Sequence, residues 1–258
     1  MSDSVILTRD DAVAHVTLNR PEVRNALDRA TIATLTSTFS DLARDETLRL
    51  VVLAGQGSVF CGGADIKYMR ESLDWTAQEN LDDALRLSVM FHAINSCPVP
   101  VIAKIQGAAL GGGAGLAAVC DIVLAADDAV FGFTEVKLGI VPAVISPFVL
   151  AKIGASHARA LFVTGERFDA TRALRIGLVH EIAPALGLDA ALLKKIEEVL
   201  TAGPQAARVA KDIARTVGTL SQQEAPAWTA TRIAQRRASA EGQEGLRAFL
   251  EKRKPSWH

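Results

Sequence analysis

Residues 109–116, Ala-Leu-Gly-Gly-Gly-Ala-Gly-Leu, are the stretch that decides the fold. They follow the apolar run 100–107, Pro-Val-Ile-Ala-Lys-Ile-Gln-Gly, which predicts a buried strand. The consecutive glycines then open a predicted helix over 113–120. Such a junction leaves backbone N–H groups free at the helix start, and the missing Cβ atoms let another group approach them closely. The alternative interpretation is a loop that only packs a helix on a strand.

A second junction of this kind lies upstream. The apolar strand predicted over 50–54 leads into residues 58–70, Ser-Val-Phe-Cys-Gly-Gly-Ala-Asp-Ile-Lys-Tyr-Met-Arg. Asp65 falls at the predicted helix start, where a carboxylate caps the helix and suits its positive end. Two such junctions on neighbouring strands can direct two N–H donors at one carbonyl oxygen. This arrangement favours thioester or ester chemistry.

Composition excludes several other classes of function. The chain has 28 basic and 29 acidic side chains, a net charge of −1, whereas general nucleic-acid binders are more basic. Cys61, Cys97 and Cys120 match no metal-binding spacing, which favours reduced, buried thiols. The N-terminus resembles neither a signal nor a transit peptide, and no apolar stretch is long enough to span a bilayer. We therefore expect a cytoplasmic protein with no metal, nucleic-acid or membrane partner.

The order of predicted elements indicates an α/β protein, because strands alternate with helices and this favours parallel pairing with right-handed crossovers. After about residue 186 only helices are predicted. Residues 205–258 carry ten basic and five acidic side chains, a net charge of +5 against −6 for the rest. These charges either cover solvated helix faces or meet ligand phosphates and acidic faces of a neighbouring molecule. The predicted strands are 5–8, 12–18, 50–54, 100–106, 121–125 and 130–133, and the predicted helices are 27–42, 65–71, 75–95, 113–119, 146–153, 156–163, 169–175, 188–200, 204–217, 222–240 and 241–252.

Four motifs, in the right order, resemble those of one known family. They are Asn19-Arg20-Pro21 with Asn25-Ala26-Leu27; residues 60–66, Phe-Cys-Gly-Gly-Ala-Asp-Ile; residues 107–113 followed by Cys120-Asp121-Ile122; and residues 131–142, Phe-Gly-Phe-Thr-Glu-Val-Lys-Leu-Gly-Ile-Val-Pro. The chain is similar to the enoyl-CoA hydratase/isomerase (crotonase) superfamily over nearly its whole length. The resemblance implies a crotonase-like spiral of ββα units over residues 1–200, holding an acyl-CoA site. It also implies a C-terminal α-helical trimerisation region over 201–258, and hence a homotrimer or a dimer of trimers.

The same resemblance implies the roles of individual residues. The backbone N–H groups of Ala64 and Gly112 would hold the thioester oxygen, and Glu135 would be the acid/base. The coenzyme A thioester is the substrate, and no further cofactor is implied. The implied substrate contacts are Arg24, Ala26, Asp65, Ile66 and Lys252, the last from the tail segment 248–253.

The chain departs from the family at the other catalytic position. Typical hydratases place a second glutamate where this sequence has Gly115, and glycine cannot transfer protons. A single Glu135 can remove the Cα proton and return it to another carbon, which is isomerisation. It can also protonate a departing β-hydroxyl, which is dehydration, the reverse of hydration. A glutamate in an apolar pocket has a raised pKa that suits both roles.

Other departures concern the acyl group. Bulky Val144 and Ile145 replace small residues, and the chain ends Phe-Leu-Glu-Lys-Arg-Lys-Pro-Ser-Trp over 249–257. With Gly115, these features resemble the bacterial branch that hydrates 3-methylglutaconyl-CoA or isohexenylglutaconyl-CoA. We expect Gly115 to leave room for the branch and to remove a like charge near the substrate carboxylate, for which Lys67, Tyr68 and Arg70 are candidate partners. The predicted function is a hydratase of this type. The alternatives are a Δ3-Δ2 enoyl-CoA isomerase and, outside enzymes, an RNA-binding or scaffolding protein.

Overall fold

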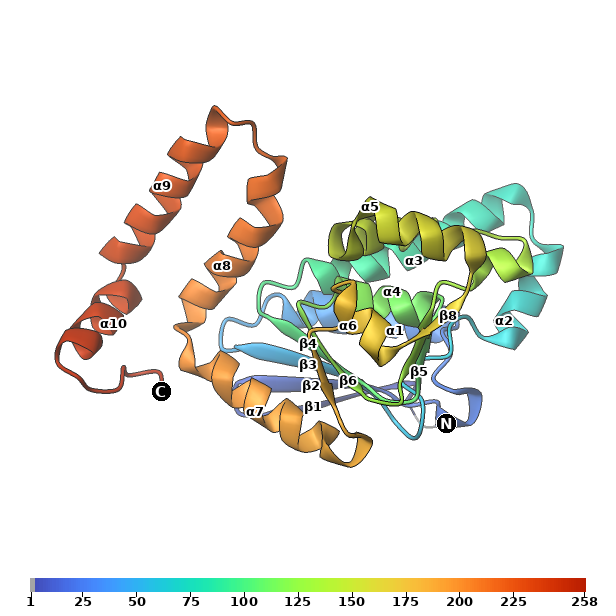
Figure 1. Cartoon of the computed structure of the whole chain (residues 1–258), viewed down its shortest axis with the longest axis horizontal. Helices are drawn as coiled ribbons and strands as arrows, with labels where there is room; N and C mark the ends of the chain where they lie inside the picture. Colours follow the sequence, from blue (N-terminus) through green and yellow to red (C-terminus); the bar gives the residue numbers. More distant parts are fainter. Residues whose placement is uncertain (1–2) are drawn as a thin grey trace.

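Two β-sheets form the centre of the computed structural model, which describes residues 3–258 (Figure 1). The larger sheet has the order β1-β2-β3-β4-β6-β9 and the smaller one β5-β7-β8. In the larger sheet β1 and β2 form an antiparallel hairpin, and every later neighbour pairs in parallel. The strands are β1 (Val5–Asp10), β2 (Val13–Leu18), β3 (Leu50–Gly55), β4 (Val101–Ile105), β5 (Ala108–Leu110), β6 (Ile122–Ala126), β7 (Val130–Gly132), β8 (Arg167–Asp169) and β9 (Glu181–Ala183).

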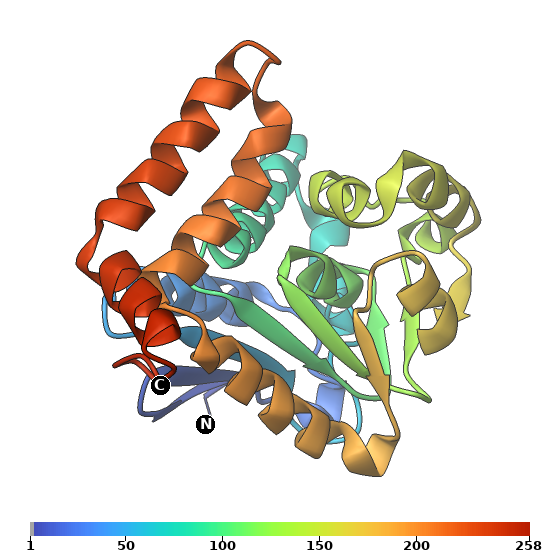
Figure 2. The same cartoon turned by 60° about the vertical axis from the view of Figure 1, so that its left-hand side comes forward.

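Helices cover both faces of the larger sheet. Helix α7 lies along one face, and α1, α3 and α4 lie on the other (Figures 1 and 2). The α-helices are α1 (Arg29–Leu42), α2 (Ile66–Glu71), α3 (Ala77–Asn95), α4 (Gly112–Val119), α5 (Ser146–Thr164), α6 (Ala170–Arg175), α7 (Leu188–Thr201), α8 (Pro204–Thr216), α9 (Glu224–Ala238) and α10 (Ala240–Leu250), and the 3-10 turns are η1 (Pro21–Val23), η2 (Ser72–Asp74), η3 (Glu135–Leu138), η4 (Ala185–Gly187) and η5 (Val217–Thr219).

The chain repeats one path through these layers. It passes from β4 in the larger sheet to β5 in the smaller sheet and then into α4. It repeats the path from β6 to β7 and on to α5. These ββα turns confirm the predicted α/β class with parallel strands. The predicted interruption near residue 154 is a kink inside α5, because Gly154 has non-helical backbone angles, φ 73° and ψ 159°. The three-residue strands β5, β8 and β9 were missed, since three residues are too few to show a period of two.

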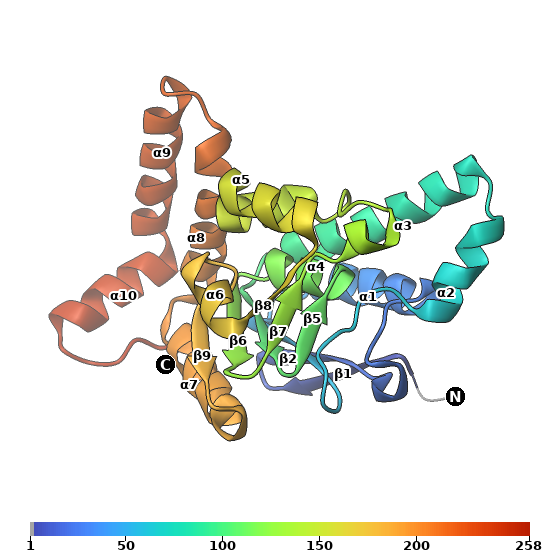
Figure 3. The ribbon, with the colours of Figure 1, turned by 45° about the vertical axis from the view of Figure 1, so that its right-hand side comes forward.

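Residues 204–258, here called the C-terminal arm, comprise α8, α9, α10 and the tail. The arm projects beyond α7, and its tail lies at the opposite end of the molecule from α2 (Figures 1 and 3). Among residues 3–258 no helix is long and apolar enough to cross a membrane. The predicted division into a core of residues 1–200 and a C-terminal region of residues 201–258 stays a prediction about domains, although α7 ends at Thr201.

Candidate active site

The structure brings the two glycine junctions together. The Cys61 amide donates to the carbonyl of Ala108 at 3.0 Å, and the Leu110 amide donates to the carbonyl of Cys61 at 3.1 Å. These bonds form a parallel bridge between the loop after β3 and strand β5. As a result, the starts of α2 and α4 open onto the same space.

Glycine is required at two positions for this approach. Gly63 has a φ of +104°, a backbone conformation that side chains disfavour. A Cβ atom at Gly113 would lie 2.4 Å from the carbonyl oxygen of Cys61, closer than any two such atoms can pack. Larger residues would therefore separate the two junctions.

The amides of Ala64 and Gly112 are free of backbone partners in the described part of the chain. The neighbours of Ala64 are engaged, because the carbonyl of Gly63 accepts from Leu27 and the amide of Asp65 donates to Leu27. Gly112 is the first residue of α4, where an amide has no acceptor within the helix. Both residues line a cavity of about 370 Å³. Two unused donors beside one cavity are what an oxyanion-binding site requires.

Asp65 supports this loop from behind. Its side chain accepts from the Lys67 amide at 2.8 Å, which caps α2, and pairs with the Arg20 guanidinium at 2.8 Å. Burial opposes ionisation, but the hydrogen bonds from Lys67 and Arg20 outweigh it and lower the pKa of Asp65. The carboxylate points into the protein, and only 4% of the side chain is exposed. The side chain of Asp65 is therefore not available to the substrate, and the predicted contact at this position can involve only its backbone.

Glu135 is the predicted acid/base group. It follows β7 as the first residue of η3 and lines the cavity. Its Oε1 lies 3.5 Å from the position that a Cβ atom would occupy on Gly111, the residue before Gly112. Its Oε2 is buried without a hydrogen-bond partner. Burial raises the pKa of the Glu135 carboxyl. A carboxyl with a raised pKa can both accept and return a proton near neutral pH.

The rest of the cavity is largely apolar. Tyr68, Asp83 and Glu135 are its ionisable side chains, and no lysine, arginine or histidine of residues 3–258 lines it. Other residues that line it are Ser72, Trp75, Asn80, Thr134, Val144 and Ile145.

The structure corrects the expectation for Gly115. A Cβ at this position would lie 2.4 Å from Cγ2 of Ile145 and 3.0 Å from the ring of Phe91. The space beside the glycine is therefore filled by these two side chains, and Gly115 does not line the cavity. Val144 and Ile145 do line it, as predicted. The glycine accommodates the bulk of Ile145 rather than a branch of the substrate.

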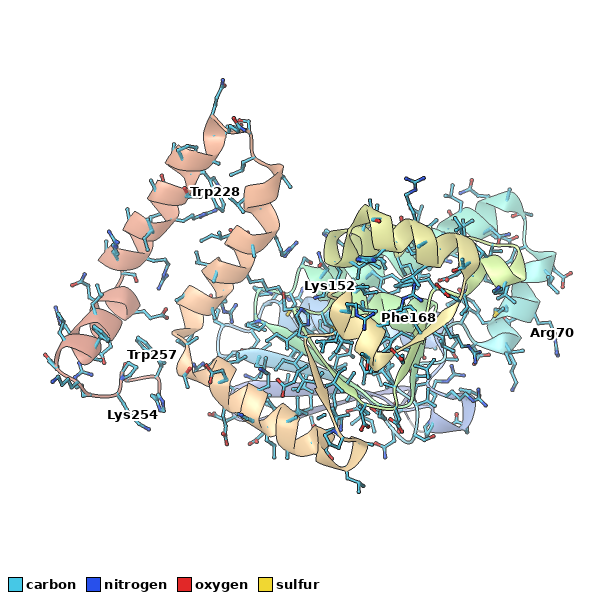
Figure 4. All side chains as sticks on the ribbon, in the orientation of Figure 1. Arg70, Lys152, Phe168, Trp228, Lys254 and Trp257 are labelled. Carbon is cyan, nitrogen blue, oxygen red and sulfur yellow. The ribbon has the colours of Figure 1, made fainter. Side chains whose placement is uncertain are left out.

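The predicted cations also lie elsewhere. Lys67 and Arg70 do not line the cavity, and the Arg70 side chain points outward from the edge of the molecule (Figure 4). Tyr68 does line it, but its hydroxyl donates to Asp83. The sequence did not single out Trp75 or Asp83, because the stretch from η2 into α3 carries no motif. Their one signal was the helix predicted over residues 75–95.

The remaining predicted substrate contacts are Arg24, Ala26, Ile66 and Lys252. Arg24 is exposed, with φ 57°, and its carbonyl accepts from the Gly62 amide at 2.8 Å. Ala26 is buried beside this turn, whereas Ile66 is 74% exposed near the cavity wall. Lys252 follows α10, in the tail marked by Lys254 and Trp257 at the end remote from Arg70 (Figure 4). Lys252 does not line the cavity of its own chain.

Comparison with known proteins defines the class. The family model described as "Enoyl-CoA hydratase/isomerase" matches residues 8–258. A Thermus thermophilus protein carrying the name of an enoyl-CoA hydratase is 37% identical over 246 residues, covering 94% of this chain and 96% of that protein. The 2,3-dehydroadipyl-CoA hydratase of Escherichia coli is 33% identical over 261 residues and 98% of both chains. A Legionella pneumophila structure titled as an enoyl-CoA hydratase/isomerase (crotonase) superposes with a TM-score of 0.94 at 40% identity over 99% of both chains.

The chain therefore belongs to the enoyl-CoA hydratase/isomerase family. The predicted crotonase-like fold is confirmed, as is the prediction of an enzyme of this hydro-lyase family.

Proposed function

We propose that this protein adds water to, or removes it from, an enoyl-CoA thioester, with the amides of Ala64 and Gly112 as oxyanion donors and Glu135 as the single acid/base. The observation that carries the proposal is the buried, unpartnered Oε2 of Glu135 in the same cavity as two unused amides. An orphaned buried carboxylate oxygen is costly to the fold and is a sign of function.

In this mechanism the thioester oxygen accepts from both amides. As water bonds to Cβ, Glu135 takes one of its protons and the π electrons move to the thioester oxygen. The enolate then recovers the proton from Glu135 at Cα, so the carboxylate is regenerated. One oxyanion donor contributes about two to three orders of magnitude in rate.

For the acyl group we propose a branched, carboxylated substrate of the 3-methylglutaconyl-CoA type. Its support is the sequence resemblance and the name of the E. coli relative, 2,3-dehydroadipyl-CoA hydratase, whose substrate also carries a terminal carboxylate. No lysine, arginine or histidine of residues 3–258 lines the cavity, and the candidate cation is Arg29, which stands next to a lining residue. Its guanidinium lies 5.3 Å from the ring centroid of Trp75, a cavity residue, and has no carboxylate within 4.0 Å in residues 3–258.

The test is a substrate panel with absorbance of the enoyl thioester as the readout. The wild type is given 3-hydroxy-3-methylglutaryl-CoA and crotonyl-CoA, and Arg29→Met is compared with Arg70→Met as the matched control. We expect Arg29→Met to reduce turnover of the carboxylated substrate about tenfold more than turnover of crotonyl-CoA, the loss of one charged contact. Equal effects on both substrates would remove Arg29 from carboxylate recognition.

The single carboxylate also supports a second candidate, the Δ3-Δ2 enoyl-CoA isomerase. That activity needs a proton moved between two carbons and no bound water, which one Glu135 can perform. A 3-enoyl-CoA substrate added to the panel distinguishes the two. Conversion to the 2-enoyl thioester without formation of hydroxyacyl-CoA would establish the isomerase. Salt-dependent retention of RNA with no acyl-CoA turnover would instead support the RNA-binding alternative.

We further propose that the protein assembles as a homotrimer or dimer of trimers through residues 201–258, with Lys252 and Arg24 near the coenzyme A of a site. The chemistry is proton transfer and needs neither a metal nor a redox cofactor. Cys61, Cys97 and Cys120 are buried and free, which supports a reducing, cytoplasmic compartment.

A further inference from the structure

The missing glutamate at Gly115 leaves a question about the attacking water. Glu135 can accept one of its two hydrogens, and another acceptor has to hold the second one for the oxygen to face Cβ. Glycine offers no such group, and its surroundings are the apolar Ile145 and Phe91.

Few other polar side chains line the cavity. The hydroxyl of Ser72 donates to the carbonyl of Met69 at 2.7 Å, and the amide nitrogen of Asn80 donates to the carbonyl of Thr76 at 3.0 Å. Both are used to fix the ends of α2 and α3. Thr134 adjoins Glu135 on the same segment. Tyr68 and Asp83 enter the cavity from α2 and α3, and unlike these three side chains they orient each other by a hydrogen bond between side chains.

These two side chains form a directed pair. The Tyr68 hydroxyl donates to Oδ1 of Asp83, whose side chain is 17% exposed. The phenol oxygen has two lone pairs, and with Arg29 acting as a donor toward it one lone pair stays available as an acceptor. The ring is fixed edge-on against Trp75, with centroids 5.3 Å apart. Burial and the Asp83 carboxylate raise the pKa of Tyr68 to about 12, so the phenol keeps its proton at neutral pH.

We propose that Tyr68, oriented by Asp83, holds the water that adds to Cβ, and so takes over the positioning role of the carboxylate absent at Gly115. Tyr68 accepts one hydrogen of the water while Glu135 removes the other. The water oxygen bonds to Cβ, the π electrons pass to the thioester oxygen, and the proton on Glu135 returns to Cα. Tyr68 neither gains nor loses a proton. This inference rests on the proposed hydratase function.

The experiment compares two reactions that share the oxyanion donors and Glu135. One is hydration of crotonyl-CoA, which needs a water molecule held at Cβ. The other is exchange of the Cα hydrogens of butyryl-CoA with D₂O, followed by NMR, in which no water adds to Cβ. The variants are Tyr68→Phe, which keeps the ring on Trp75, and Asp83→Asn. Asp82→Asn is the matched control, because this carboxylate accepts from Gln78, one turn earlier on α3, and does not line this cavity.

We expect Tyr68→Phe to lower kcat for hydration about 30-fold and to leave the exchange rate within about threefold, since one hydrogen bond to the water is lost. The kcat for hydration by Asp83→Asn, which retains an acceptor oxygen, should lie between those of Tyr68→Phe and the wild type. The kcat of Asp82→Asn should match that of the wild type. Hydration by Tyr68→Phe within about threefold of the wild type, or an equal fall in both reactions, overturns the inference alone. So does a selective loss of hydration in Thr134→Val with Tyr68→Phe unaffected. A wild type that exchanges but does not hydrate overturns the proposed hydratase and this inference with it.

Discussion

The spiral and the C-terminal arm are held by different forces. Strands β3 and β4 are almost entirely buried, and the two glycine junctions approach within van der Waals contact. In the arm, α9 has no buried residue, α8 has only Lys211 and α10 only Ala248. The part of the cavity where the two junctions meet is therefore fixed by packing within one chain.

The arm is anchored mainly by cations that bind carbonyl groups. Arg208 donates to the carbonyl of Leu48 at 2.7 Å, and Arg49 donates to that of Trp257 at 3.0 Å. Lys211 donates to Val99 and pairs with Asp121 at 2.6 Å. Meanwhile Phe249 and Leu250 are 81% and 77% exposed. The arm is thus attached to the spiral by polar contacts, whereas its apolar side chains at Phe249 and Leu250 are left exposed. Exposed apolar side chains of this kind suit a region that packs on another protomer.

The largest effect is expected at the cavity. Glu135→Gln should lower kcat at least about 10³-fold, because it removes the acid/base while conserving shape. Steady-state kinetics measure the loss, and coenzyme A binding by calorimetry should be unchanged. A variant with more than a tenth of the wild-type rate, a loss under about 1.4 kcal/mol, would refute the assignment of Glu135.

The next prediction tests how tightly the spiral is packed. Gly115→Glu should destabilise the protein by about 3 kcal/mol, because even its Cβ overlaps Ile145. Gly115→Ala is the matched control. Alanine normally stabilises a helix interior relative to glycine, so a destabilised Gly115→Ala would identify the overlap as the cause. Adding Ile145→Ala should recover part of the loss in urea unfolding, and additive effects would contradict the contact.

Lys211→Met breaks the anchor between the arm and the spiral. It should cost about 2 kcal/mol in unfolding free energy, since Asp121 is left without its ammonium partner in a partly buried site. Limited proteolysis should then cut first near residue 203, before α8. Proteolysis that proceeds equally across the spiral would show that the two regions unfold together.

A smaller effect separates stability from activity within the cavity. Burial raises the folded-state pKa of Glu135 above its unfolded value, so its contribution to stability is full below the unfolded pKa and is lost as the pH rises through the folded one. Glu135→Gln should therefore be more stable than the wild type near pH 8, and this difference in unfolding free energy should disappear near about pH 4. Urea unfolding at both pH values checks this, and a difference that is largest in acid would reverse the argument.

The smallest change in protomer stability is expected on the arm. Phe249→Ser with Leu250→Ser should alter the unfolding free energy of the protomer by less than about 0.5 kcal/mol, because both side chains are exposed. The same variant should shift the assembly toward monomers in analytical ultracentrifugation. An unchanged assembly would show that these apolar residues lie outside the interface between protomers.

Sequence by itself determined the parts that local chemistry specifies. The glycine runs and apolar strands predicted both junctions, the parallel sheet and the helical C-terminal region. The motifs predicted Ala64, Gly112 and Glu135 as site residues, and the structure places all three on one cavity.

Only the tertiary structure decided which side chains share that cavity. The sequence predicts open space beside Gly115, but the side chains of Ile145 and Phe91, which come from other elements of the chain, fill that space. Lys67 and Arg70 lie within two residues of Tyr68 in the sequence, yet the short helix α2 turns Tyr68 and Met69 onto the cavity and leaves both cations outside it. There α3 brings Asp83 to the Tyr68 hydroxyl. The reason is physical: spacing along a chain fixes the face of a helix, whereas what lies opposite that face depends on long-range packing.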